Sequence, residues 1–310
     1  MGPALTEARL TTLARGLLAL WRWFARPFSR RALLEAALVG GGFLLYFAVR
    51  GLVVDRPETA YSNALDVIGV ERYLGFFWEP DMQDWIKNRL FLVQSANIIY
   101  FYLHFPLIVV FGIWLYFHDQ RKYTVMRDML LASGGLALIV YWLYPVAPPR
   151  ELPNLAAQFD PNAPSYVSTF IDTMKVHLGY AYQSQSTAAF VNPYAAMPSL
   201  HFGWDMLLGG GIIWTFWQTR LRWVALPIGV ALPAMQVASI TVTANHFFLD
   251  AMAGGAVCLT AIPVAWGLQR WGYPFLGRSL ARLPWPFVAK LLALQRREEA
   301  AASGSEKARV

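Results

Sequence analysis

The strongest constraint on the fold of this chain is a set of six apolar stretches of about 20 residues, the length of helix that crosses the hydrocarbon core of a bilayer. These stretches cover residues 33–54, 91–117, 130–146, 200–217, 224–244 and 247–268. A chain with this pattern is expected to be all-α, a polytopic membrane protein built on a six-helix transmembrane bundle.

The composition agrees with a membrane protein and excludes other classes. Only 15% of the 310 residues are charged, against about 25% in soluble domains, and 56% are hydrophobic. A disordered chain would be poorer in apolar residues, and a disulfide scaffold is excluded because Cys258 is the only cysteine. The net charge of +7 fits either nucleic-acid binding or basic residues that flank membrane spans, so their positions decide.

The positions of the basic residues predict the orientation of the chain. Of the 26 Lys and Arg residues, 19 lie in segments 1–31, 118–128, 218–223 and 269–310, and seven lie in the alternate segments. Because Lys and Arg gather on the cytoplasmic side, both termini are expected in the cytoplasm, in an integral protein of the plasma membrane. The basic excess therefore marks topology, and we expect no nucleic-acid partner.

The chain divides into three expected parts. Residues 1–31 combine arginines with Trp21 and Trp23 and are predicted to form a basic helix in the plane of the membrane. Residues 32–268 form the six-span domain, and residues 269–310 form a basic cytoplasmic tail whose end is expected to be disordered.

Two long segments connect the spans on the outer side. Residues 55–90 mix apolar side chains with carboxylates, which predicts short amphipathic helices on the outer surface. Residues 147–198 are rich in Pro, Asn and Ser, which predicts a long loop with little regular structure. Loops of this length usually carry function.

Ionisable residues at the ends of the spans are candidates for function, because charge near a membrane is costly. Arg150 follows the third span, His201 opens the fourth, and His246 and Asp250 open the sixth. Under the predicted topology all of them lie at the outer boundary, although they are spread over a hundred residues of sequence. This convergence predicts one site at the extracytoplasmic face.

The residue types suit phosphoryl transfer. His246 and Asp250 are four residues apart, so on a helix the carboxylate could hold one ring nitrogen and leave the other as a nucleophile. His201 could protonate a leaving group. Arg150 and the backbone amides near Ser199, at a helix N-terminus, could bind the phosphate.

Three motifs carry a resemblance to a known family. They read YPVAPPR at 144–150, PSLH at 198–201 and HFFLD at 246–250. The last two resemble signature motifs of the type 2 phosphatidic acid phosphatase superfamily, and with the first they are most similar to the branch of inositol phosphorylceramide synthases and their bacterial relatives. The likeness covers about residues 60 to 268.

The resemblance implies roles for the matching residues. His246 would be the nucleophile that forms a phosphohistidine, Asp250 would orient it, and His201 would protonate the departing oxygen. The resemblance implies no metal and no cofactor. Two positions depart from the usual motifs: Ile240 stands where an Arg usually precedes the nucleophile by six residues, and Leu200 replaces a Gly. Arg150 becomes the main candidate for neutralising the phosphate.

Other polar residues near the outer boundary are candidates for support. Asp205 could orient His201 or pair with a group on the cytoplasmic side. Asn97, Tyr100 and His104 form one stripe on the second span, for which a hydrogen-bonded seam between helices is favoured over substrate contact. Tyr144, in the first motif, could contact the substrate or support the site.

The sequence therefore predicts an enzyme whose catalytic site lies within residues 32–268 and acts on membrane lipid phosphates or phosphodiesters. Transfer to an alcohol such as inositol or a sugar is slightly favoured, since segment 147–198 could shield the intermediate from water. Hydrolysis by a lipid phosphatase is the alternative. A lipid transporter or scaffold without catalysis is the second alternative.

Overall fold

The computed structural model describes residues 30–52, 56–178 and 194–280. The basic segment predicted over 1–31 and the end of the tail predicted over 269–310 lie largely outside these residues. Every regular element within these residues is a helix, and the only β-type pairing among them is an isolated bridge between Val146 and Ala195. The expectation of an all-α membrane protein is confirmed.

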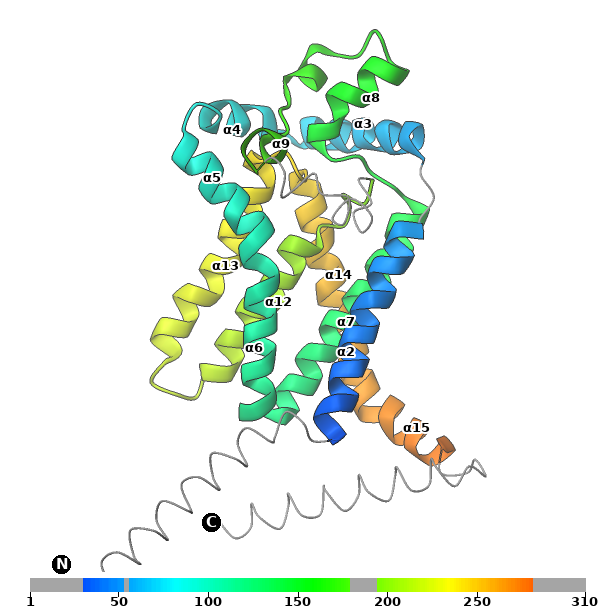
Figure 1. Ribbon diagram of the computed structural model, residues 1–310, viewed down its shortest axis with the longest axis vertical. Coiled ribbons are helices and arrows are strands. Elements are labelled where there is room, and N and C mark those ends of the chain that lie inside the picture. Colours follow the sequence, from blue (N-terminus) through cyan, green and yellow to red (C-terminus); the bar gives the residue numbers. More distant parts are fainter. Residues whose placement is uncertain (1–29, 53–55, 179–193, 281–310) are drawn as a thin grey trace, which may run out of the picture.

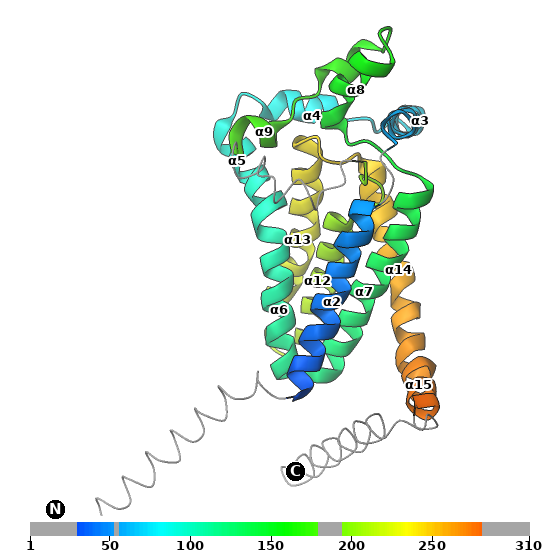
Figure 2. The same cartoon turned by 45° about the vertical axis from the view of Figure 1, so that its right-hand side comes forward.

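A bundle of long helices forms the body of the protein (Figures 1 and 2). Its elements are α2 (Arg30–Leu52), α5 (Leu90–Ile98), η2 (Ile99–Leu103), α6 (His104–His118), α7 (Gln120–Leu143), α12 (Leu200–Phe216), α13 (Arg222–Val242) and α14 (Phe248–Gly267). Helix α5 runs through η2 into α6 as one continuous rod, and α14 continues through η5 (Leu268–Gly272) into α15 (Tyr273–Leu280).

Five of these helices in the described part of the chain are long and apolar enough to cross a membrane. They are Ala32–Arg50, Leu90–His118, Gln120–Leu143, Arg222–Val242 and Phe248–Ser279. The remaining expected span, the fourth in sequence at 200–217, corresponds to α12. This helix has 17 residues and a length of about 25 Å at about 1.5 Å per residue. Helix α12 packs among α13, α14, α7 and α6 in the middle of the bundle. The count of six spans stays a prediction.

Short helices cover one end of the bundle, opposite the beginning of α2 and the end of α15 (Figure 1). They are α3 (Pro57–Leu74), α4 (Glu79–Ile86), η3 (Pro149–Glu151), α8 (Leu152–Phe159), η4 (Ser165–Thr169) and α9 (Thr173–Leu178). The helices predicted over 55–90 are thus present as α3 and α4.

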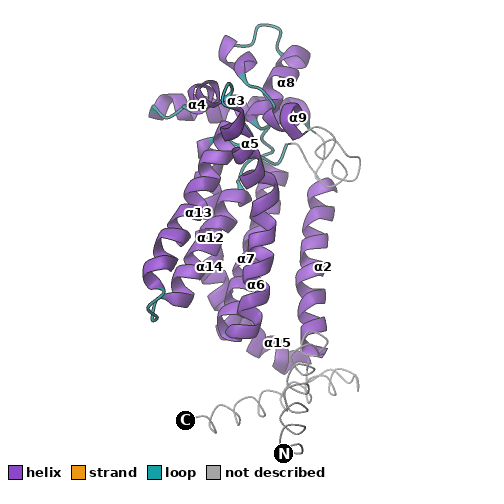
Figure 3. Ribbon diagram, turned by 60° about the vertical axis from the view of Figure 1, so that its left-hand side comes forward, coloured by secondary structure: helices purple, strands orange, loops and turns teal. Residues whose placement is uncertain are grey.

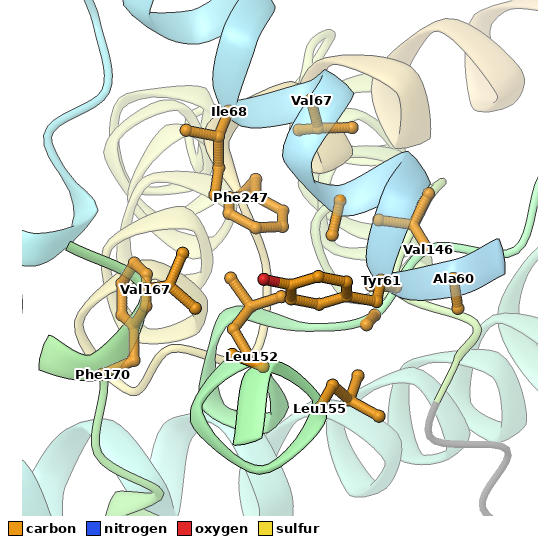
Figure 4. Close-up of a cluster of buried hydrophobic side chains, with 14 of the residues drawn as sticks. Ala60, Tyr61, Val67, Ile68, Val146, Leu152, Leu155, Val167, Phe170 and Phe247 are labelled. Atoms are coloured by element: carbon orange, nitrogen blue, oxygen red, sulfur yellow. The ribbon is translucent and has the colours of Figure 1, made fainter. Parts of the chain in front are cut away.

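The loop predicted over 147–198 is more regular than expected. Its apolar side chains pack against α3 in a buried cluster that includes Tyr61, Leu152, Leu155 and Val167 (Figure 4). Burial of this size stabilises short helices that their own sequence would leave marginal. The segment therefore forms an ordered cover, at least as far as Leu178.

Helix α7 begins ten residues earlier than the predicted span. Asp119 ends the preceding helix and caps α7, since its carboxylate accepts a hydrogen bond from the amide of Lys122 (3.0 Å). Arg127 is buried in the second turn, where its guanidinium forms an ion pair with Glu35 of α2 at 2.5 Å. The predicted loop over 118–128 is therefore wrong, because a cap and a partnered charge allow polar residues inside the helix.

The closest approach of α12 and α13 occurs at two glycines. A Cβ atom built at Gly209 would collide with the backbone carbonyl of Gly229, whereas one built at Gly210 would meet nothing within 4 Å. Small residues of this kind let helix backbones touch in a membrane.

We expect Gly209→Ala to destabilise the protein by about 1–3 kcal/mol, because α12 and α13 must separate to admit the methyl group. The matched change Gly210→Ala on the neighbouring residue should leave stability unchanged or slightly raised. Thermal unfolding of both variants in detergent measures the difference, and equal melting temperatures would contradict this packing.

Candidate functional site

The predicted histidines meet at the covered end of the bundle. His201 opens α12 and His246 lies just before α14, with their ring centroids 5.6 Å apart. Tyr100 of η2 packs against His201, with ring centroids at 4.4 Å, and lies 6.4 Å from His246. His201 is half-buried and His246 is buried. The structure thus brings together side chains from η2, from α12 and from the turn before α14.

A backbone hydrogen bond fixes the ring of His246. Its Nδ1 lies 2.8 Å from the carbonyl oxygen of Ala196. Because a carbonyl oxygen only accepts, Nδ1 must carry the hydrogen, and the neutral ring then has its lone pair on Nε2. This is the protonation state that a nucleophilic imidazole needs.

Asp250 relates to His246 differently from the sequence expectation. The predicted arrangement on one helix is wrong, because α14 begins only at Phe248 and His246 precedes its cap. The Asp250 carboxylate accepts from the amide of Phe247 at 2.9 Å, and its Oδ2 lies 3.4 Å from Nδ1 of His246. It therefore caps the helix and adds a nearby negative charge, while the carbonyl of Ala196 makes the shorter contact.

Ser199 joins the two halves of the site. The Ser199 amide donates to the backbone carbonyl of Asp250 at 2.8 Å. A Cβ atom built at Gly254 would collide with the backbone carbonyl of Ser199, so the two segments are in close contact. The Ser199 hydroxyl makes no hydrogen bond to any residue that the structure describes. Ser199 occupies the N-cap position of α12, and the first-turn amides at a helix N-terminus favour an anion.

Arg150 reaches the site from η3. Its Nη1 donates to the Oδ1 of Asn245, and its Nε lies 3.6 Å from the Glu151 carboxylate and 3.7 Å from the Asp172 carboxylate. The Arg150 amide also donates to the carbonyl of Ala244 at 2.9 Å. The arginine is therefore tied to the turn that carries His246.

Asn245 is a site residue that the sequence analysis missed. Besides accepting from Arg150, its amide nitrogen Nδ2 donates to Thr243 at 2.7 Å. The preceding Ala244 has a left-handed backbone with φ of 55°, a conformation that non-glycine residues rarely adopt outside functional turns. The only sequence signal for Asn245 is its place next to His246.

Ile240 fills the position of the missing arginine with an apolar side chain. It is fully buried, and its carbonyl accepts from the amides of Asn245 at 2.9 Å and His246 at 3.2 Å. The residue therefore shapes the turn and offers no charge to a phosphate.

A second histidine–aspartate pair lies behind His201. His104 Nδ1 lies 2.8 Å from the Asp205 carboxylate, and both side chains are buried. The His104 ring centroid is 4.9 Å from that of His201, and its other neighbour Trp204 stacks on it at 6.1 Å. Asp205 thus pairs with His104 beside the histidine cluster, a partner that neither of its two predicted roles named.

The remaining candidates have structural partners. Asn97 is buried and exchanges hydrogen bonds with Thr173 of α9 at 3.1 and 3.0 Å. Tyr144 donates to the carbonyl of Asn63 at 3.4 Å and packs against the apolar cluster of the cover. The polar stripe of the second span therefore divides, since Tyr100 and His104 face the histidines and Asn97 anchors the cover.

Two buried carboxyls cap α14 from the cover. Glu79 accepts from the amide of Phe248 at 2.8 Å, and Glu71 accepts from the amide of Leu249 at 2.7 Å. Burial, together with the charge of Glu79, raises the pKa of Glu71 to about 9, and burial also raises the pKa of Glu79. The N-terminus of α14 is thus filled by carboxyl groups, whereas the Ser199 hydroxyl at the N-terminus of α12 has no partner among the described residues.

An apolar groove of about 380 Å³ runs along the bundle between α2, α6, α7 and α12. In Figure 3, α2 forms the outer edge of the bundle beside α6. The groove extends from Glu35 and Arg127 to Phe43 and Trp204, and Trp204 stacks on His104. The end of the groove nearest the cover is therefore separated from the histidines only by the Trp204 side chain.

Comparison with known proteins gives one match. A model of the PAP2 superfamily matches residues 65–264, which include both histidines, Asp250 and Arg150. No curated protein and no solved structure matches the chain. Among the described residues, no group of three or more His, Cys, Asp and Glu side chains could hold a metal ion.

The Glu71 carboxyl predicts a dependence of stability on pH. Its pKa is about 9 in the folded protein and 4.5 ordinarily, so the folded state holds a proton that the unfolded state lacks between these values. We expect the melting temperature in detergent to fall as the pH rises from 5 to about 9, because the unfolded state alone gains from losing the proton. Glu71→Gln, which stays neutral, should flatten this slope.

Glu58→Gln is the matched control for this measurement. Glu58 is exposed on the same helix, so its variant should keep the wild-type slope. A Glu71→Gln variant with the same pH dependence as the wild type would show that the proton is not held by this carboxyl.

Proposed function

The chain belongs to the PAP2 superfamily, and on this premise we propose that it transfers the phosphoryl group of a membrane lipid phosphate or phosphodiester through a phosphohistidine at His246. Membership supports an enzyme of phosphatase or phosphotransferase type, and the apolar helices mark an integral membrane protein. The observation that carries the proposal is the bond from Nδ1 of His246 to Ala196, which leaves Nε2 basic beside His201.

The first step forms the covalent intermediate. The lone pair of His246 Nε2 attacks phosphorus, the bond from phosphorus to the lipid oxygen breaks, and its electron pair stays on that oxygen. His201 gives the leaving oxygen a proton. The charge of Arg150 acts on His201, so a bound phosphate that neutralises this charge favours the protonated imidazole that the step needs.

The second step returns the enzyme to its starting state. His201, now neutral, takes the proton of an acceptor hydroxyl while the acceptor oxygen attacks phosphorus. The bond between phosphorus and Nε2 breaks, and its electron pair returns to the ring of His246. Asp250, 3.4 Å from Nδ1, stabilises the positive ring that exists while phosphorus is bound.

Arg150 and Ser199 are proposed to bind the phosphate. A guanidinium can hold two oxygens at once, and the Ser199 hydroxyl and the first-turn amides of α12 donate from the opposite element. The filled N-terminus of α14 supports this choice, because its first amides are already bonded to carboxyl groups.

We favour an alcohol acceptor, such as inositol or a sugar, over water. The cover formed by α8, η4 and α9 supports this choice, because an intermediate shielded from bulk water reacts with a bound alcohol instead. The lipid substrate is supported by the apolar groove, whose upper end reaches Trp204 and His104 beside the histidines.

The orientation follows from the distribution of charge. The 19 basic residues in segments 1–31, 118–128, 218–223 and 269–310 support cytoplasmic termini. The histidines lie at the starts of α12 and α14, at the end of the bundle opposite the start of α2. The site is therefore proposed to lie at the extracytoplasmic face of the plasma membrane.

The acceptor can be tested directly. Purified protein is incubated with polyprenyl, diacylglycerol and ceramide phosphates and phosphodiesters, with and without inositol or sugar acceptors. We expect a phosphorylated acceptor to form, and to form at the expense of free phosphate as the acceptor concentration rises. Free phosphate from every donor, at a rate that no acceptor changes, would identify a phosphatase instead.

His246→Ala is the control that links the product to the site. Removal of the nucleophile should lower turnover by about 10⁴-fold or more, since only binding effects remain. His118→Ala removes an exposed histidine at the opposite end of the bundle and should leave turnover unchanged. Undiminished turnover in His246→Ala would refute the covalent route and favour a protein without this catalysis.

A further inference from the structure

Arg50 is a basic residue of the covered end that the sequence analysis counted only as a topology charge. It lies in the last turn of α2, before the region that matches the PAP2 superfamily, which begins at residue 65. Its side chain is half-buried, and its Nε atom is buried. A guanidinium at this depth needs a reason, because charge at a membrane span is costly.

An aromatic side chain holds the guanidinium in place. The Arg50 Cζ atom lies 5.7 Å from the ring centroid of Tyr141, within the range of a cation–π contact. Tyr141 is buried and donates its hydroxyl hydrogen to the carbonyl of Pro198 at 2.8 Å. Pro198 lies three residues before His201, so the position of Arg50 is tied to the start of α12.

The charge of Arg50 acts on the same groups as that of Arg150. Both guanidiniums interact electrostatically with Tyr100 and with His201, and they interact with each other. They come from elements that are 100 residues apart in the sequence, α2 and η3. Two like charges that interact in this way repel each other, and an anion bound between them turns the repulsion into attraction.

The phosphate in the proposed function is such an anion. In the reacting phosphate, the oxygens that are not part of the breaking or forming bonds carry the negative charge, and there are two of them in a phosphodiester and three in a monophosphate. Arg150 approaches from the side of the His246 turn, through its contact with Asn245, and Arg50 approaches from the side of Tyr141 and Pro198. The two arginines thus act on His201 from different elements.

We propose that Arg50 and Arg150 together bind the non-bridging oxygens of the substrate phosphate, so that α2 completes the substrate site. This inference rests on the proposed function, and it assigns Arg50 to substrate binding. Helix α2 then contributes at both ends of the lipid, since it also forms one wall of the apolar groove.

The test compares Arg50→Met and Arg50→Lys with the wild type, in turnover of the lipid phosphate donor and in thermal stabilisation by inorganic phosphate. We expect Arg50→Met to lower kcat/KM about 30- to 100-fold, the effect of losing a charge-assisted hydrogen bond at the reacting group. Stabilisation by inorganic phosphate should also be lost. Arg50→Lys should recover part of both, because a lysine keeps the charge and loses the bidentate geometry.

Arg56→Met is the matched control. Arg56 lies at the same end of the bundle, and its guanidinium donates to the backbone carbonyl of Trp142. Its variant loses the same charge and should keep wild-type kcat/KM and phosphate stabilisation. If Arg50→Met does not fold, Arg50→Lys decides, with a loss of about tenfold in kcat/KM and weaker phosphate stabilisation expected.

Wild-type kcat/KM and wild-type phosphate stabilisation in the folded Arg50 variant would overturn the proposal, as would a wild-type protein that phosphate does not stabilise. His246→Ala separates this result from failure of the proposed function. That variant keeps both arginines, so it should lose turnover and keep its stabilisation by phosphate.

Discussion

The hydrogen bond between His246 and the carbonyl of Ala196 is the interaction on which the site depends. It fixes the tautomer of the imidazole, and it needs two loops to stay in register across the end of the bundle. The amide of Ser199 bonded to the carbonyl of Asp250 joins the same two loops at a second point. Asn245 connects this unit to Arg150, so the proposed nucleophile, the proposed phosphate ligand and the cover are held by one set of polar contacts.

The two helix N-termini at the site have different uses. The first amides of α14 are bonded to Asp250, Glu79 and Glu71, which fastens the helix to the cover. The first turn of α12 carries His201, and the Ser199 hydroxyl before it makes no hydrogen bond within the described part of the chain. In the proposed mechanism an incoming phosphate therefore meets the first turn of α12 and the guanidinium groups, while the carboxyl groups stay bonded to the amides of α14.

Much of the fold could be predicted because apolar stretches record membrane spans directly, and the convergence of His201, His246 and Arg150 followed from topology alone. The helical relation of His246 to Asp250 could not, because the start of α14 depends on a cap that involves Phe247 and the cover. The pairing of Asp205 with His104 depends on how α6 packs against α12. Arg50 and Glu71 carry no local signal, since a surface charge and a buried one look the same in a sequence.

The covalent bond between phosphorus and His246 is the step that defines the proposed function. It is tested most directly by incubating the protein with a lipid monophosphate donor without acceptor, quenching under alkaline conditions that preserve phosphohistidine, and mapping the modified peptide by mass spectrometry. The account predicts a phosphoryl group on His246 that disappears when an acceptor alcohol is added. Turnover without any modified histidine, or a phosphoryl group on His201 instead, would contradict it.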